Sequence, residues 1–93
     1  MKTLSSGEIA DRLAKVPGWQ LQGKEITKLF RFPSFKAALA FVNKVGDIAE
    51  AADHHPDVTI NYNRVTLALT THAAGGLTER DFALAAEIET VAP

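Results

Sequence analysis

The spacing of apolar residues predicts three helices. In three segments the apolar positions recur three and four residues apart, as on one face of a helix, and these segments run over about 6–16, 35–52 and 79–91. Ser5 and Thr78 stand before the first and last segments, each with a carboxylate three residues later. That spacing is typical of a capping box, and Ser34 offers an N-cap for the middle helix.

Alternation of apolar and polar residues predicts four strands in two hairpins. The strands are expected at 19–22, 25–32, 58–62 and 65–70. Gly23-Lys24 turns the first hairpin, and residues 61–63 turn the second. Because strands joined as hairpins are antiparallel, the order α-β-β-α-β-β-α predicts an α+β fold. We expect a four-stranded antiparallel sheet with the three helices packed on one face.

The middle helix carries two apolar stripes. The first stripe holds Phe35, Leu39, Val42 and Ala49, and the second holds Phe41, Val45 and Ile48. Two stripes indicate a helix buried on two sides, against the sheet and against a neighbour. An apolar stripe left exposed would favour self-association.

Composition narrows the class of protein. A chain of 93 residues is expected to form a single domain, residues 1–93. Its net charge of −1 does not indicate the basic surface that binds nucleic acid. The absence of cysteine excludes disulfides, thiolate zinc sites and thiol catalysis. The sequence shows neither a signal-peptide core nor a run of ~20 apolar residues. We therefore expect a soluble, cytoplasmic protein that does not enter a membrane.

The chain has three histidines, and the second hairpin is expected to bring them together. His54 and His55 follow the middle helix, and His72 follows the fourth strand. Because the third and fourth strands pair about their turn, the segments before Val58 and after Leu69 should end near each other. Imidazole donates and accepts protons near neutral pH. The cluster therefore suits a reaction that needs an acid and a base but no nucleophile and no cofactor.

Carboxylates are expected around these histidines. Glu50, Asp53 and Asp81 belong to the same segments of the chain. Glu50 precedes His54 by four residues, so the two are expected on one helix face. Other interpretations stay open at this point: Asp81 can serve only as a helix cap, and Glu50 and Arg80 can be solvated surface residues.

Two alternatives compete with acid–base chemistry. The histidines can have a purely structural role, or all three can hold a zinc ion. The adjacent residues His54 and His55 would have difficulty pointing at one ion, which disfavours the metal site.

The strand period raises a question about His72. Strict alternation from Val65 puts His72 on the face of Thr66 and Ala68, whereas the histidine pair arrives from the helix side. For His72 to join the pair, either the strand ladder ends by about Thr70, or a bulge redirects the side chain.

The histidine segments resemble the signature of a known family. The spacing E-x3-HHP-x5-Y-x9-H-x8-D is made by Glu50, His54, His55, Pro56, Tyr62, His72 and Asp81. This spacing, with the strings DHHPDV and TTHAAGGLT, is similar to that of the pterin-4a-carbinolamine dehydratases. The resemblance covers essentially the whole chain.

The resemblance implies a fold, an assembly and a reaction. The family has a four-stranded antiparallel sheet with helices on one face, and it forms homodimers by sheet extension and tetramers through helices. It dehydrates 4a-hydroxytetrahydropterins to quinonoid dihydropterins without a metal or organic cofactor. This step recycles the cofactor of aromatic amino acid hydroxylases, so a functional link to such a hydroxylase is implied. The pterin of molybdenum cofactor metabolism is an alternative substrate.

The resemblance also implies residue roles. His54 and His72 would be the catalytic acid/base pair, and His55, the third histidine of the site, would bind and orient the pterin. The substrate-binding positions of the family match Glu50, Asp53, Arg80 and Asp81. A non-catalytic role, as a dimerization cofactor or an assembly factor, is the competing interpretation. The intact histidine spacing favours the enzyme, because a protein used only for binding does not need it.

Overall fold

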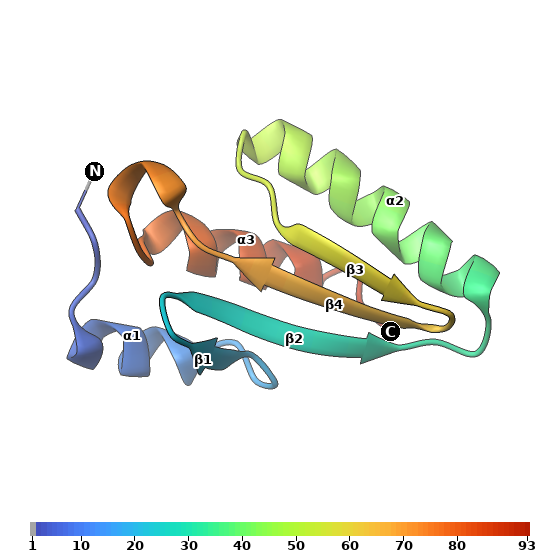
Figure 1. Ribbon diagram of the computed structural model, residues 1–93, viewed down its shortest axis with the longest axis horizontal. Coiled ribbons are helices and arrows are strands. Elements are labelled where there is room, and N and C mark those ends of the chain that lie inside the picture. The colour runs from blue at the N-terminus through green and yellow to red at the C-terminus, as the bar shows by residue number, and fades with distance from the viewer. Residues whose placement is uncertain (1) are drawn as a thin grey trace.

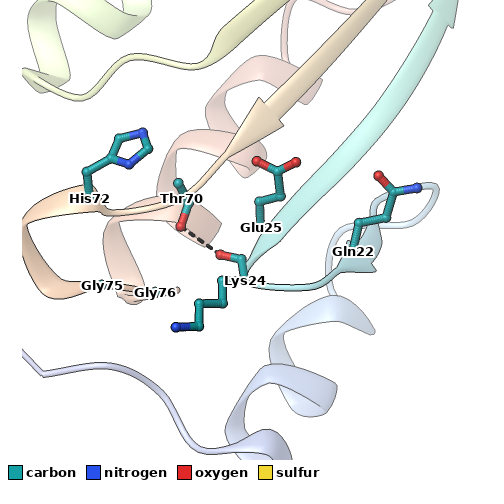
Figure 2. Close-up of a pocket in the computed structure, with 7 residues that line it drawn as sticks. All are labelled: Gln22, Lys24, Glu25, Thr70, His72, Gly75 and Gly76. Carbon is teal, nitrogen blue, oxygen red and sulfur yellow. Dashed lines mark hydrogen bonds between the residues drawn. The ribbon is translucent and has the colours of Figure 1, made fainter.

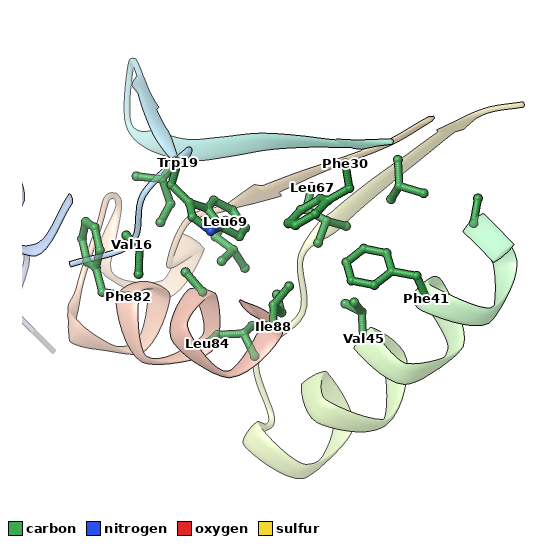
Figure 3. Close-up of a cluster of buried hydrophobic side chains, with 14 of the residues drawn as sticks. Val16, Trp19, Phe30, Phe41, Val45, Leu67, Leu69, Phe82, Leu84 and Ile88 are labelled. Carbon is green, nitrogen blue, oxygen red and sulfur yellow. The ribbon is translucent and has the colours of Figure 1, made fainter. Parts of the chain in front are cut away.

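A single antiparallel sheet organises the chain in the computed structural model, which describes residues 2–93. The strands are β1 Gln20–Gln22, β2 Glu25–Arg31, β3 Asp57–Asn61 and β4 Arg64–Leu69, in the spatial order β1-β2-β4-β3. The helices are α1 Ser6–Leu13, α2 Phe35–Ala52 and α3 Glu79–Glu89, with a short 3₁₀ helix η1 at His72–Ala74. The helices cover one face of the sheet (Figure 1; Figure 3). The predicted α+β fold is therefore confirmed.

The apolar core lies between the sheet and the helices, as Figure 3 shows. Alternate residues of β2 and β4 enter it, and the buried ones include Ile26, Phe30, Val65, Leu67 and Leu69. In β3, by contrast, Val58 is 41% exposed. The helices contribute Phe41, Val45, Leu84 and Ile88. The ring centroid of Phe41 lies 4.8 Å from that of Phe30 and 5.0 Å from that of Phe32. These contacts hold α2 against the sheet.

Only one face of α2 is buried within the chain. Its buried residues are Ala38, Phe41, Val45 and Ala49. Phe35 and Leu39, of the other predicted stripe, keep 45% and 36% of their surface exposed. α2 contacts both β4 and α3, as the two stripes predict, but Phe35 and Leu39 stay outside these contacts in the single chain.

The N-caps of α1 and α3 form as predicted. Ser5 and Glu8 make a capping box, in which the Ser5 N–H donates to Glu8 Oε1 at 2.8 Å. This bond holds the pKa of Glu8 below its usual value. Thr78 and Asp81 make the second box, at the start of α3.

The C-terminal ends of α1 and α3 differ from the predicted ones, whereas α2 has the predicted bounds. Helix α1 ends at Leu13 rather than near Val16. Beyond its end, the N–H of Val16 donates to the carbonyl of Leu13, which makes a tighter turn than a helix. The following residue, Pro17, disfavours helical geometry at Val16. Helix α3 ends at Glu89, short of residue 91.

The β3–β4 turn lies within the predicted residues 61–63, but β3 ends one residue earlier than expected. Tyr62 has φ 55°, in the left-handed region, so β3 ends at Asn61. The side chain of Asn63 donates to the carbonyl of Phe32 at 2.9 Å and ties this turn to the segment before α2. Within residues 2–93, no helix is both long enough and apolar enough to cross a bilayer.

Candidate active site

A change of backbone direction at the end of α2 separates the two adjacent histidines. Asp53 has φ 50° and ψ 43°, a left-handed conformation that ends the helix. The N–H of His54 then donates back to the carbonyl of Ala49 at 3.1 Å. As a result His54 is buried, with 9% of its surface exposed, whereas the side chain of His55 is 54% exposed.

His54 is anchored to a buried carboxylate. Its Nε2 lies 2.6 Å from Oδ1 of Asp81, and Asp81 has no exposed surface. Oδ2 of Asp81 accepts from the hydroxyl of Thr71 at 2.8 Å and from the N–H of Thr78 at 2.9 Å. With Asp81 as a carboxylate, which only accepts, Nε2 of His54 carries the proton of the shared bond. The nitrogen left for other chemistry is Nδ1.

The two threonine hydroxyls form a chain with a fixed direction. Thr71 Oγ1 and Thr78 Oγ1 lie 2.8 Å apart. A hydroxyl has one proton, and that of Thr71 is donated to Asp81, so Thr78 must donate to Thr71. Thr78 Oγ1 in turn accepts from the N–H of Arg80 at 3.3 Å. The chain therefore orients Asp81, and through it the ring of His54.

His72 lies beyond the end of the sheet ladder. Strand β4 ends at Leu69, Thr71 forms an isolated bridge with Gly76, and His72 begins the 3₁₀ helix η1. The first of the two predicted alternatives, an early end of the ladder, is confirmed. The α2–β3 and β4–α3 connections lie at the same end of the sheet (Figure 1).

The structure brings the three histidines to one cavity. We call it the histidine pocket; it measures about 260 Å³ and is lined by Asp53, His54, His55, Thr70, Thr71, His72, Ala73 and Arg80. Of the residues expected around the histidines, Asp53 and Arg80 line this pocket, whereas Glu50 and Asp81 do not. Among residues 2–93, no three His, Cys, Asp or Glu side chains gather closely enough to hold a metal ion.

Glu50 contacts a different histidine from the one expected. Its carboxylate bonds to Nε2 of His55, and not to His54. The prediction relied on helical spacing from Glu50 to His54, but the helix stops at Ala52 and Asp53 is left-handed, so that spacing no longer holds.

Arg80 closes the end of α2. Its Nη2 donates to the carbonyl of Asp53 and, at 3.4 Å, to that of Ala52. These are among the last carbonyls of the helix, which have no partner within it. Arg80 thus fixes the connection that carries the histidine pair while it also lines the histidine pocket.

Sequence reasoning missed Thr71. The residue is 2% exposed and is central to the hydrogen-bond chain behind His54. A signal was present, because Thr71 shares the parity of Val65, Leu67 and Leu69, whose side chains enter the core. A hydroxyl at a core position needs a buried partner, and Asp81 supplies it.

Comparison with known proteins agrees with this architecture. The sequence model of the family described as "Pterin 4 alpha carbinolamine dehydratase" matches residues 2–91. A protein of Chloroflexus aurantiacus named "Putative pterin-4-alpha-carbinolamine dehydratase" is 59% identical over 91 residues, which are 98% of each chain. A protein of the same name from Acidobacterium capsulatum is 57% identical over 91 residues, 98% of this chain and 99% of the relative.

Two solved structures are similar to the chain. The "transcriptional coactivator/pterin dehydratase from Brucella Melitensis" superposes with a TM-score of 0.94 at 35% identity and covers 99% of this chain and 100% of that one. A "pterin dehydratase-like protein", identified as a RuBisCO assembly factor in the alpha-carboxysome, has a TM-score of 0.68 at 26% identity, with 80% and 88% coverage. With the family model matched over nearly its whole length, the chain belongs to the pterin-4a-carbinolamine dehydratase family.

Proposed function

We propose that the protein dehydrates 4a-hydroxytetrahydropterins to quinonoid dihydropterins by histidine acid–base catalysis. The observation that carries this proposal is the convergence of the three histidines on one pocket, with one of them held by a buried carboxylate. The pterin is inferred as the substrate from the family to which the chain belongs.

The reaction needs two proton transfers and no change of oxidation state. The bond between carbon 4a and its hydroxyl oxygen breaks while an acid protonates that oxygen, which leaves as water. A base removes the proton from nitrogen 5, and the electron pair of that bond forms the double bond between nitrogen 5 and carbon 4a. A positioned side chain contributes about 10²–10⁴-fold to such a transfer.

The surroundings of the histidines suggest their roles. Because Asp81 engages Nε2 of His54, Nδ1 of His54 is free to take the nitrogen-bound proton, and Asp81 then faces the imidazolium that forms. His72, on the exposed 3₁₀ helix, serves as the acid for the departing oxygen. His55, paired with Glu50, orients the pterin ring. Asp53 and Arg80, which also line the pocket, contact its polar edge.

The test is the dehydration rate of freshly generated 4a-hydroxytetrahydropterin. We expect the wild type to accelerate it, and His54→Ala and His72→Ala each to lose at least about tenfold, the lower end of what one lost transfer costs. Glu87→Gln, on the exposed side of α3, is the matched control and should keep the wild-type rate. A folded wild-type protein without any acceleration would overturn the proposal.

A binding role is the second candidate. The observation that favours it is the pair Phe35 and Leu39, two large apolar side chains exposed on α2. One structural neighbour, a pterin dehydratase-like protein, is described as an assembly factor. In a purely binding protein, His54→Ala and His72→Ala would leave partner capture unchanged, and no dehydration would be measured with the wild type.

The same exposed residues support self-association. We propose that the protein is a homo-oligomer in which the α2 stripe of Phe35, Leu39 and Val42 packs against a second copy. The sheet also has two open edges, at β1 and β3, whose unpaired backbone groups can pair with another copy.

A further inference from the structure

The segment of residues 2–5, which leads into α1, contacts the connection that carries His72. We propose that this segment positions His72 for proton transfer, through a hydrogen bond from Leu4 and a close contact between Thr3 and Gly76. The inference rests on the function proposed above. It assigns a positioning role to Thr3 and Leu4, which lie outside the family signature and do not line the histidine pocket.

His72 differs from the other two histidines in how its side chain is held. The rings of His54 and His55 each bond to a carboxylate. Within the described part of the chain, the ring of His72 takes part in no hydrogen bond or ion pair. Figure 2 shows this ring projecting away from the Gly75-Gly76 pair. The position of the ring therefore depends on the backbone that carries it.

The backbone of residues 71–76 folds into a closed turn around His72. The N–H of Thr71 donates to the carbonyl of Gly76 at 3.1 Å, and the N–H of Gly76 donates to the carbonyl of Thr71 at 3.3 Å. That carbonyl also accepts from the N–H groups of Ala74 and Gly75, both at 3.0 Å. Because His72 directly follows Thr71, a shift of Gly76 across this bridge would also shift His72.

The N-terminal segment contacts this turn at Gly76 and at the next residue, Leu77. The N–H of Leu4 donates to the carbonyl of Leu77 at 2.9 Å. A Cβ built on Gly76 would lie 3.3 Å from Cγ2 of Thr3, and Thr3 is the residue that it would meet within 4 Å. Gly76, unlike Gly75, does not have a positive φ. The contact with Thr3, rather than the backbone conformation, is thus what favours glycine at this position.

The segment is itself fixed by the start of α1. Leu4 is partly buried and packs against the core, as does Ile9 of α1. The residue after Leu4 is Ser5, the N-cap of α1, whose N–H donates to Glu8. Because the segment is already ordered by these contacts, its bond to Leu77 costs little further conformational entropy. The segment can therefore hold the turn in place.

The rate of proton transfer depends steeply on where His72 lies. A misplacement of 1 Å can lower a rate about 10²-fold. A Cβ on Gly76 would require its neighbour to move by a few tenths of an ångström, so a loss of several-fold is expected if the turn moves instead. Such a loss should appear in kcat and not in KM, because a group that acts in the transfer step contributes little to substrate binding.

The experiment compares Leu4→Pro with Leu4→Ala in steady-state dehydration kinetics. Both variants shorten the side chain, but proline lacks the N–H that bonds to Leu77, whereas alanine keeps it. We expect Leu4→Pro to have a kcat about fivefold below that of Leu4→Ala, with KM within about twofold. In a His72→Ala background the two variants should have the same kcat, because the side chain that the bond positions is absent.

Gly76→Ala tests the other contact, and it also serves if Leu4→Pro does not fold. We expect its kcat to fall about threefold, with KM little changed. Thr3→Ala in the same chain should restore kcat, because it removes the methyl group that the new Cβ meets. A loss that Thr3→Ala does not restore would overturn the inference, since the Cβ would then act on the neighbouring cavity and not through Thr3.

Equal kcat values for Leu4→Pro and Leu4→Ala would also overturn the inference, and so would a difference that persists in the His72→Ala background. In both cases wild-type acceleration would leave the proposed dehydratase function standing. If the wild type does not accelerate the reaction, the proposed function fails, and NMR of the histidine rings decides the positioning role.

The ring signal of His72 is identified by its absence from the spectrum of His72→Ala. We expect this signal to differ between Leu4→Pro and Leu4→Ala, whereas the signals of His54 and His55, which have carboxylate partners, should move less. A His72 signal that is the same in the two Leu4 variants would contradict the positioning role, whatever the protein catalyses.

Discussion

At the scale of single residues, the carboxylate of Asp81 joins His54, the proposed base, to the start of α3. One oxygen meets His54 and the other accepts from Thr71 and Thr78, so every donor in this buried cluster has a defined acceptor. The same side chain completes the capping box of α3. Asp81 therefore both caps α3 and contacts His54, two roles that the sequence analysis treated as alternatives.

Replacement of Thr71 by valine tests whether this cluster positions His54. Valine keeps the shape but removes one donor to Asp81 and leaves the Thr78 hydroxyl without its acceptor. We expect kcat to fall about tenfold, from the loss of a buried hydrogen bond to a charged group, with KM little changed. Thr71→Ser, which keeps the hydroxyl, should restore most of kcat.

The measurement is steady-state dehydration kinetics with a pH profile of kcat/KM, together with thermal unfolding of each variant. If Thr71 had only a structural role, valine would lower the unfolding temperature and leave both kcat and the pH profile of the folded enzyme unchanged. That result would contradict the positioning role.

The histidines and the carboxylates around them could be found from the sequence, but the pairing of each carboxylate with its histidine could not. His54, His55 and His72 are the three histidines of the sequence, and they lie in segments that a predicted hairpin brings together. The Glu50 contact depends on where α2 ends, and the left-handed conformation of Asp53 has no clear sequence signal. Helical spacing therefore assigned Glu50 to the wrong histidine.

At the scale of elements, the end of α2 decides where the histidine pair points. Asp53 takes the left-handed conformation in which glycine is preferred, and Arg80 binds its carbonyl. The next residue, His54, turns inward, and His55 turns outward.

Substitutions at Asp53 should separate this backbone role from a role in substrate binding. Asp53→Ala should lower the free energy of unfolding by about 1 kcal/mol, because aspartate adopts the left-handed conformation more readily than alanine does. Asp53→Gly should be at least as stable as the wild type. Urea denaturation measures both.

Activity gives the complementary comparison, since both variants lack the carboxylate. If Asp53 contacts the pterin, glycine and alanine should lose kcat/KM to a similar degree despite their different stabilities. A glycine variant less stable than the alanine variant would be inconsistent with the conformational argument.

The elements themselves followed from the sequence more fully than their ends. Apolar spacing and N-cap residues identified the three helices, and the alternation of apolar and polar residues identified the four strands. The ends depended on local competition that periodicity does not report, such as the constraint of Pro17 on Val16 and the positive φ of Tyr62.

At the scale of the whole molecule, the apolar stripe of Phe35 and Leu39 has no contact within the single chain that explains why it is apolar. Both residues are exposed on α2, with Val42 half-buried on the same stripe. Burial of the stripe against a second copy would complete the two-sided packing that the sequence pattern predicts for this helix.

Leu39→Glu tests this assembly. A charge in an apolar contact loses its hydration without a partner, so we expect the variant to sediment as a smaller species than the wild type at the same concentration. Ala40→Glu is the matched control, because it adds the same charge to an exposed position about 100° around the same helix. Sedimentation velocity reports both, and a wild-type monomer would contradict the proposed assembly.

The sequence pattern did not predict which strands of the two hairpins pair with each other. β2 pairs with β4, so the β1–β2 turn lies beside the end of β4, and a second cavity forms there between Lys24 and His72 (Figure 2). Local alternation predicts each hairpin but does not say which edges meet, since that contact joins residues far apart in the chain. The fold class could therefore be predicted, whereas the second cavity could not.

The most direct test of the central claim is a double-variant cycle on the dehydration rate, with His54→Gln, His72→Gln and the two combined. If the histidines act as acid and base in one step, each single variant should lose at least about tenfold, and the double variant should lose little more than the worse single one. Losses that multiply would show that the two residues act independently. A wild-type protein that does not accelerate the reaction would contradict the claim outright.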